Sequence, residues 1–292
     1  MQQILDAIDQ FFTDILVNML EGNLSGVFNA LDGKVGEISG YATETPESWN
    51  GTIFGFITNL SETVIVPIAG LVITYVLIYE LITMVMDKNN FHDFDSSLFF
   101  RYLGKACIAV VIVSHTQEIV EALFEVGSDI AASVTGEIGG TSLNVETTLF
   151  PMIESEALSM SIGTLFMNVI ETLVIRFVVL IIGLYVKLII YSRFIEIYLY
   201  MSIAPIPFAT MTNREWGSIG TNYLRGLLAL AFQAFLIMAC VGIYSTLISS
   251  MASINSMGTF SNALHEILIY TALLAVSLSR TSSIAKSIFN TH

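Results

Sequence analysis

Three ionisable residues, Glu171, Arg176 and Lys187, lie within one long apolar stretch of the sequence, residues 162–190. An ionisable side chain at membrane depth is costly and needs a partner or water. Glu171 and Arg176 are five positions apart, which turns them to different faces of a helix, so they are not expected to pair within it. We expect the three side chains to contact neighbouring helices, or to face a polar lumen or another subunit. A proton relay is the third alternative.

The residue types that usually carry catalysis or bind metals form no recognisable pattern in this sequence. The histidines show no ligand spacing with cysteine, aspartate or glutamate, and there is no glycine-rich phosphate loop, G-x-S-x-G or H-E-x-x-H stretch. Both cysteines lie in apolar stretches, which favours buried thiols over a disulfide. We therefore predict a protein that is not an enzyme and that needs no metal or other cofactor.

The composition indicates a membrane protein. Of the 292 residues, 54% are hydrophobic and 12% are charged, and the mean hydropathy is +0.74. Soluble domains carry about 25% charged residues, roughly twice this fraction. The charges are also segregated: residues 1–62 hold nine acids and a single base, Lys34, and residues 115–160 hold eight acids and no base. A nucleic-acid-binding surface needs clustered bases, so the sequence argues against one.

Apolar runs of spanning length predict an all-α, polytopic transmembrane fold with about five full spans and one broken, re-entrant segment. The predicted spans are residues 63–86, 99–126, 162–190, 224–250 and 263–279. Residues 62–292 would form the membrane domain, and residues 127–161 would form an extracytoplasmic loop.

Residues 1–61 predict an extracytoplasmic, amphipathic N-terminal region. Apolar residues recur at helical spacing, Gly22 offers a stop for a first helix, a second amphipathic segment follows, and residues 39–52 are interpreted as a loop. Because the polar face is acidic, packing against another subunit or the chain's own membrane domain is favoured over adhesion to lipid. The candidate assembly face consists of Phe11, Phe12, Ile15 and Leu16.

Residues 194–211 are predicted to form a broken segment. Pro205 and Pro207 each remove a backbone donor and clash one turn back, so they cannot continue a regular helix. Broken backbone at membrane depth is tolerated only when it is buried in protein or faces water. Lysine and arginine concentrate on the cytoplasmic side of membranes, and the bases are best placed there if this segment dips in and returns. The N-terminus is then outside and the C-terminus cytoplasmic; a full crossing, which would give six spans, is the alternative.

The stretch 187–240 contains a long helix with basic flanks, then Ala204-Pro205-Ile206-Pro207 and the sequence NREWGSIGTNYLRGLLALAFQAFL. With the acidic N-terminal region and the layout of the spans, it resembles the TrbL-like polytopic membrane subunits of type IV secretion and conjugation systems. The resemblance implies a non-enzymatic channel or scaffold subunit in the bacterial cytoplasmic membrane. Such subunits would assemble in several copies in lipid, around the path of DNA or protein substrate, with ATPases and other secretion subunits as partners. A secondary transporter and a membrane-anchored exclusion or immunity protein are the alternatives.

Overall fold

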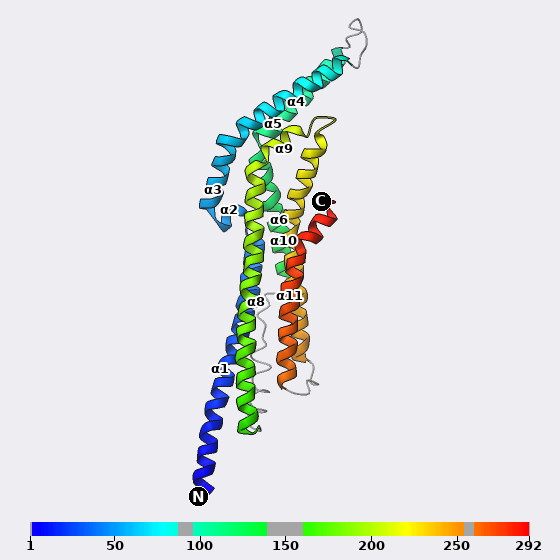
Figure 1. Ribbon diagram of the computed structural model, residues 1–292. Coiled ribbons are helices and arrows are strands. Elements are labelled where there is room, and N and C mark those ends of the chain that lie inside the picture. Colours follow the sequence, from blue (N-terminus) through cyan, green and yellow to red (C-terminus); the bar gives the residue numbers. More distant parts are fainter. Residues whose placement is uncertain (1, 87–95, 139–159, 254–259, 292) are drawn as a thin grey trace. The chain divides into compact units, whose positions relative to one another are not determined.

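The computed structural model describes residues 2–86, 96–138, 160–253 and 260–291 (Figure 1). All regular structure within these ranges is helical. The helices are α1 (Gln2–Thr43), α2 (Pro46–Trp49), α3 (Gly51–Leu60), a π-helical turn (Ser61–Ile65), α4 (Val66–Met86), α5 (Ser96–Ser114), α6 (Thr116–Ile138), α8 (Ile162–Ile203), α9 (Pro205–Thr210), α10 (Gly217–Ser253) and α11 (Phe260–Ile288).

Four of the described helical stretches are long and apolar enough to cross a membrane, which confirms the predicted all-α, polytopic fold. They are Gly51–Met86, Ile162–Ile203, Gly217–Ser250 and Ser261–Ile288. A fifth candidate is the pair Phe99–Ser114 and Thr116–Thr135, which is bent by 66° at His115. The chain is therefore a multi-pass membrane protein. Which side of the membrane each terminus occupies stays a prediction, as does the division at residues 61 and 62.

The predicted helix stop at Gly22 is wrong, because α1 continues through it to Thr43. A glycine inside a helix costs only about 1 kcal/mol relative to alanine. The apolar side chains before and after Gly22 form one continuous buried stripe, including Leu20, Leu24 and Val27. Burial of this stripe outweighs the local cost of the glycine.

The predicted loop at residues 39–52 is also mostly helical. Only short breaks separate α1, α2 and α3. Thr45 caps α2 by accepting a hydrogen bond from the Ser48 amide, and the Ser48 hydroxyl in turn accepts one from the Thr45 amide. Asn50 caps α3 in the same way through the Ile53 amide. The polar residues that favour a loop reading serve here as helix caps. Residues 127–138, predicted as part of a loop, belong to α6, and residues 139–159 lie outside the described residues.

The chain packs as two compact units, each made of separate stretches of sequence. Unit 1 comprises Met1–Ala42, Ala131–Ile190 and Phe235–Thr281, and unit 2 comprises Thr43–Ile130, Tyr191–Ala234 and Ser282–His292. In unit 1, α1 and α8 lie side by side and run in the same direction (Figure 1). Unit 1 holds the three ionisable residues predicted as polar contacts, and unit 2 holds the proline pair.

Candidate functional site

Lys187 of α8 pairs with α1 in unit 1. Its Nζ lies 2.8 Å from Oε1 of Glu37, and the other oxygen of the same carboxylate pairs with Nζ of Lys34. The three side chains are 37%, 25% and 33% exposed, respectively. One half-buried carboxylate thus serves two ammonium groups, one from its own helix and one from α8.

Arg176 lies about three helical turns before Lys187 and approaches the backbone of α1. A Cβ placed on Gly26 would lie 2.7 Å from Cζ of Arg176, so with any other residue there the guanidinium would have to move away from α1. The absence of a side chain at Gly26 is therefore what lets the guanidinium lie against α1. Nearby, Asn23 of α1 donates to Oγ1 of Thr172 at 3.4 Å. The α1–α8 contact is polar on both sides of Arg176.

Glu171 contacts α11 rather than α1. Ser261 donates to Oε1 of Glu171 at 2.7 Å, and Nδ1 of His265 lies 3.5 Å from the same oxygen. A serine, a histidine and a carboxylate together suggest a nucleophile, but a catalytic relay needs the serine and the carboxylate on opposite ring nitrogens. Here Oγ of Ser261 and the carboxylate both approach Nδ1. The arrangement is a polar clamp between α8 and α11.

Pro205 and Pro207 lie in unit 2, in the short helix α9. The residues of the predicted broken segment up to Ile203 continue α8, so the break begins only at Ala204. Proline at the first position of a helix needs no donor, and Pro205 occupies that position in α9. With six residues, α9 is about 9 Å long, far too short to cross a membrane. Residues 194–211 are thus the end of one long helix followed by a short one.

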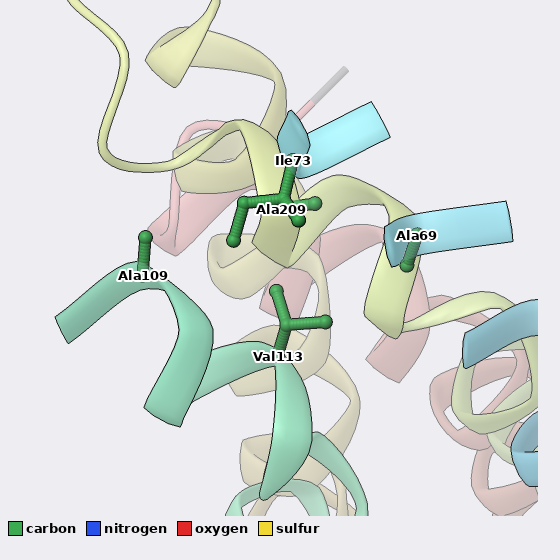
Figure 2. Close-up of a cluster of buried hydrophobic side chains, with 5 residues drawn as sticks. All are labelled: Ala69, Ile73, Ala109, Val113 and Ala209. Carbon is green, nitrogen blue, oxygen red and sulfur yellow. The ribbon is translucent and has the colours of Figure 1, made fainter. Parts of the chain in front are cut away.

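Helix α9 packs against α4 and α5 through small side chains. Ala209 of α9 is fully buried with Ala69 and Ile73 of α4 and with Ala109 and Val113 of α5 (Figure 2). Three alanines in this cluster let the helix backbones approach closely, as is common between helices in membranes. The proline break therefore seats a short helix against two neighbouring helices.

The turn after α9 is held by side-chain caps and by one tryptophan. Oδ1 of Asn213 accepts hydrogen bonds from the amides of Glu215 and Trp216. The Trp216 ring stacks on Tyr75 and Tyr79 of α4, with ring centroids 5.5 Å and 5.1 Å away. Tyr79 also donates to Glu215 at 2.8 Å. These contacts fasten the α9–α10 turn to α4.

A close contact at Gly220 completes the turn. Its amide donates to Oγ1 of Thr210 at 3.2 Å, and a Cβ there would overlap the carbonyl oxygen of Pro207 and the side chain of Met211. Sequence reasoning missed Gly220, although its position shortly after the proline pair was the available signal.

The predicted assembly face on α1 is divided by the structure. Phe11, Phe12 and Ile15 are 62%, 51% and 40% exposed, but Leu16 is buried within the chain. Ile15 and Leu16 are adjacent, so their side chains point about 100° apart around the helix, and Leu16 falls on the buried stripe while Ile15 does not. An assembly role stays a prediction for the three exposed residues.

Sequence reasoning also missed an aromatic cluster and a buried arginine at the end of α8. Trp49 stacks on Phe194 with a centroid distance of 4.5 Å, and Tyr198 donates to the Pro46 carbonyl oxygen at 2.7 Å. Arg193 is 5% exposed, its Nε and Nη1 have no hydrogen-bond partner among the described residues, and its guanidinium lies 5.4 Å from the Phe194 ring centroid. The neighbouring polar residue Glu196 pairs instead with Lys286 at 2.7 Å.

The family model described as TrbL/VirB6 plasmid conjugal transfer like protein matches residues 31–205, which is more than half of the chain. No curated protein and no solved structure matches. The matched range includes Glu37, Glu171, Arg176 and Lys187, and it ends at Pro205.

Proposed function

Because the chain belongs to the TrbL/VirB6 family of plasmid conjugal transfer proteins, we propose that it is a channel or scaffold subunit of a conjugative type IV secretion apparatus. It would stand in the cytoplasmic membrane of a bacterium, assist the passage of DNA or protein substrate, and catalyse no reaction itself. Its partners would be lipid, further copies of itself and other secretion subunits, including ATPases.

The observation that carries this proposal is that ionisable residues of α8 contact neighbouring helices. Glu171 contacts α11, and Lys187 contacts α1, at hydrogen-bonding or ion-pair distances. Charged residues that move a solute or a proton usually line a water-filled path. Here they fasten one helix to its neighbours, which supports a structural role over a transporter.

The length of α8 also supports the proposal. Its 42 residues extend about 63 Å, roughly twice the ~30 Å hydrocarbon core of a bilayer. Even a tilted helix of this length extends beyond the hydrocarbon region, where it can contact soluble or membrane-bound partners. We place the N-terminus outside and the C-terminus in the cytoplasm, from the distribution of lysine and arginine.

A clean deletion in the conjugative element tests the function. We expect DNA transfer to fall to background while growth without mating is unchanged, and the wild-type gene supplied in trans to restore transfer. Normal transfer from the deletion strain would refute the proposal.

Purification with native partners tests the scaffold role separately. The detergent-extracted protein should copurify in several copies with an ATPase of the apparatus. A lone monomer that catalyses saturable uptake in liposomes, and loses it in the Glu171→Gln variant, would instead establish a transporter.

A further inference from the structure

The charges of α8 bear on where its neighbour α1 lies. This helix carries five ionisable acids and bases along its length: Glu171, Arg176, Lys187, Arg193 and Glu196. A membrane crossing takes about 20 residues. Any stretch of that length chosen within α8 contains at least two of the five. Wherever the bilayer lies along α8, it therefore encloses ionisable groups that need partners.

The partners in the middle of α8 come from α1, in matching order along the two helices. Asn23 contacts Thr172, and Gly26 lies against Arg176. Further on, Lys34 lies against Gly183: a Cβ added to Gly183 would be 3.1 Å from Cε of Lys34. Glu37 then pairs with Lys187. Both helices advance by almost the same number of residues between the first contact and the last, so they run parallel and level.

This segment of α8 is also its most apolar part. Residues 177–186 contain no aspartate, glutamate, lysine, arginine or histidine, and the exposed side chains among them include Phe177, Leu180, Ile181 and Leu184. Exposed aliphatic and aromatic side chains over about two turns are the pattern of a helix surface that faces lipid. The α1 residues level with it are then at the depth of the acyl chains.

On the other side, α1 buries its apolar stripe, including Val27, Leu31 and Val35, within unit 1. Its remaining residues include Asp32, Lys34, Glu37 and several glycines, which lower its hydropathy below that of a spanning helix. Hydropathy scales treat each charge as isolated, whereas Glu37 and the two lysines neutralise one another in part. A helix of this kind escapes detection by hydropathy.

We propose that residues 23–38 of α1 lie within the membrane beside α8, and that the Glu37 carboxylate holds them there by neutralising Lys187. Because the helices are parallel, the start of α1 lies on the same side of the membrane as the start of α8. This replaces the extracytoplasmic placement predicted from the sequence for these residues. It adds a crossing before Gly51–Met86, so the two termini lie on opposite sides only if the bent pair Phe99–Ser114 and Thr116–Thr135 enters and leaves the membrane on the same side. It requires only that α8 crosses the membrane, and so it does not depend on the role in conjugation.

Charge exchange tests the role of Glu37. Glu37→Lys and Lys187→Glu should each reduce the amount of full-length protein recovered in membranes severalfold, and the double exchange should restore most of it. Asp14→Lys, an exposed change on the part of α1 that precedes the contacts with α8, is the matched control and should leave the amount unchanged. A double exchange no better than the worse single change would overturn the pairing.

Spin labels test the depth directly, without altering the charges. In the full chain reconstituted in liposomes, a label at position 33 should collide with oxygen more than with a water-soluble nickel chelate. The ratio should match that of a label at the exposed position Leu184 of α8, which lies at nearly the same level. Gly33 has open space around its Cβ, so a label fits there. Nickel accessibility at position 33 tenfold above that at 184 would overturn the proposal.

Discussion

Replacing Gly220 with alanine should destabilise the turn between α9 and α10. At an open helical position this change gains up to about 1 kcal/mol of helix propensity. At Gly220 the new methyl group would overlap the carbonyl oxygen of Pro207 and the side chain of Met211, and would lie 3.2 Å from the Met211 amide nitrogen. Overpacking of this kind costs about 1–3 kcal/mol.

The upper end of that range applies here, because two of the three obstructing groups are backbone atoms of a proline-containing turn. Subtracting the gain in propensity leaves a net loss of about 2 kcal/mol. For a chain of this size each kcal/mol lowers the melting temperature by roughly 2–4 °C. We therefore expect the purified Gly220→Ala protein to melt ~4–8 °C below wild type.

Thermal unfolding in detergent, followed by circular dichroism and by gel filtration of heated samples, measures the difference. The matched control is Gly104→Ala in α5, an exposed helical glycine with no atom within 4 Å of its Cβ, which should leave the melting temperature unchanged or raise it. Equal melting temperatures for Gly220→Ala and Gly104→Ala would refute the close packing of the turn.

Three further changes have expected outcomes measured by the same unfolding assay. Trp216→Ala should lower the free energy of unfolding by about 1–3 kcal/mol, because the Trp216 ring stacks on two tyrosines of α4. Trp216→Phe should recover part of this loss. An unchanged stability in the alanine variant would show that Trp216 does not hold the turn against α4. Tyr198→Phe should lower the free energy of unfolding by about 1 kcal/mol, because the hydrogen bond to α2 is lost. The control Tyr185→Phe, at a residue that is 48% exposed, should leave the stability unchanged. Equal effects of the two changes would contradict a stabilising role for the Tyr198 hydrogen bond. Arg193→Met should stabilise the isolated protein by about 1–4 kcal/mol, since it removes a buried charge whose Nε and Nη1 have no hydrogen-bond partner in the described part of the chain. A destabilised variant would show that the charge is compensated.

The helices and the positions that need partners could be predicted from the sequence, because both depend on local pattern. Apolar runs of spanning length located the spans, and the proline pair marked a break within a few residues of Ala204. Helix bounds were less accurate where a single residue type was taken as a stop. Gly22 lies in the interior of α1 because tertiary burial outweighs its weak local preference.

The partners themselves could not be predicted, because they depend on contacts between distant parts of the chain. Glu171 meets Ser261, 90 residues away, and Lys187 meets Glu37, which lies in a different helix. One signal for the latter existed: Lys34 is the single base among the first 62 residues, and it lies one helical turn from Glu37.

Arg193 and Gly220 show a second limit of sequence reasoning. An arginine near the end of a span is most simply interpreted as an interfacial, solvated group, yet Arg193 is buried. A glycine near a turn has many explanations, and only the positions of the Pro207 and Met211 atoms identify the steric one.

The π-helical turn at Ser61–Ile65 determines which way the two halves of the first apolar span face. Ile57 in α3 and Ala69 in α4 are both buried and are twelve positions apart. In an unbroken α-helix, successive residues turn by about 100°, so these two side chains would point about 120° apart. A π-turn accommodates one extra residue, and the remaining eleven steps leave them about 20° apart. The inserted residue thus keeps the buried side chains before and after the π-turn on the same side of Gly51–Met86. Losing one residue inside this turn would preserve the alignment, whereas losing one between Ala69 and Ile73 would rotate the beginning of the span away from its neighbours.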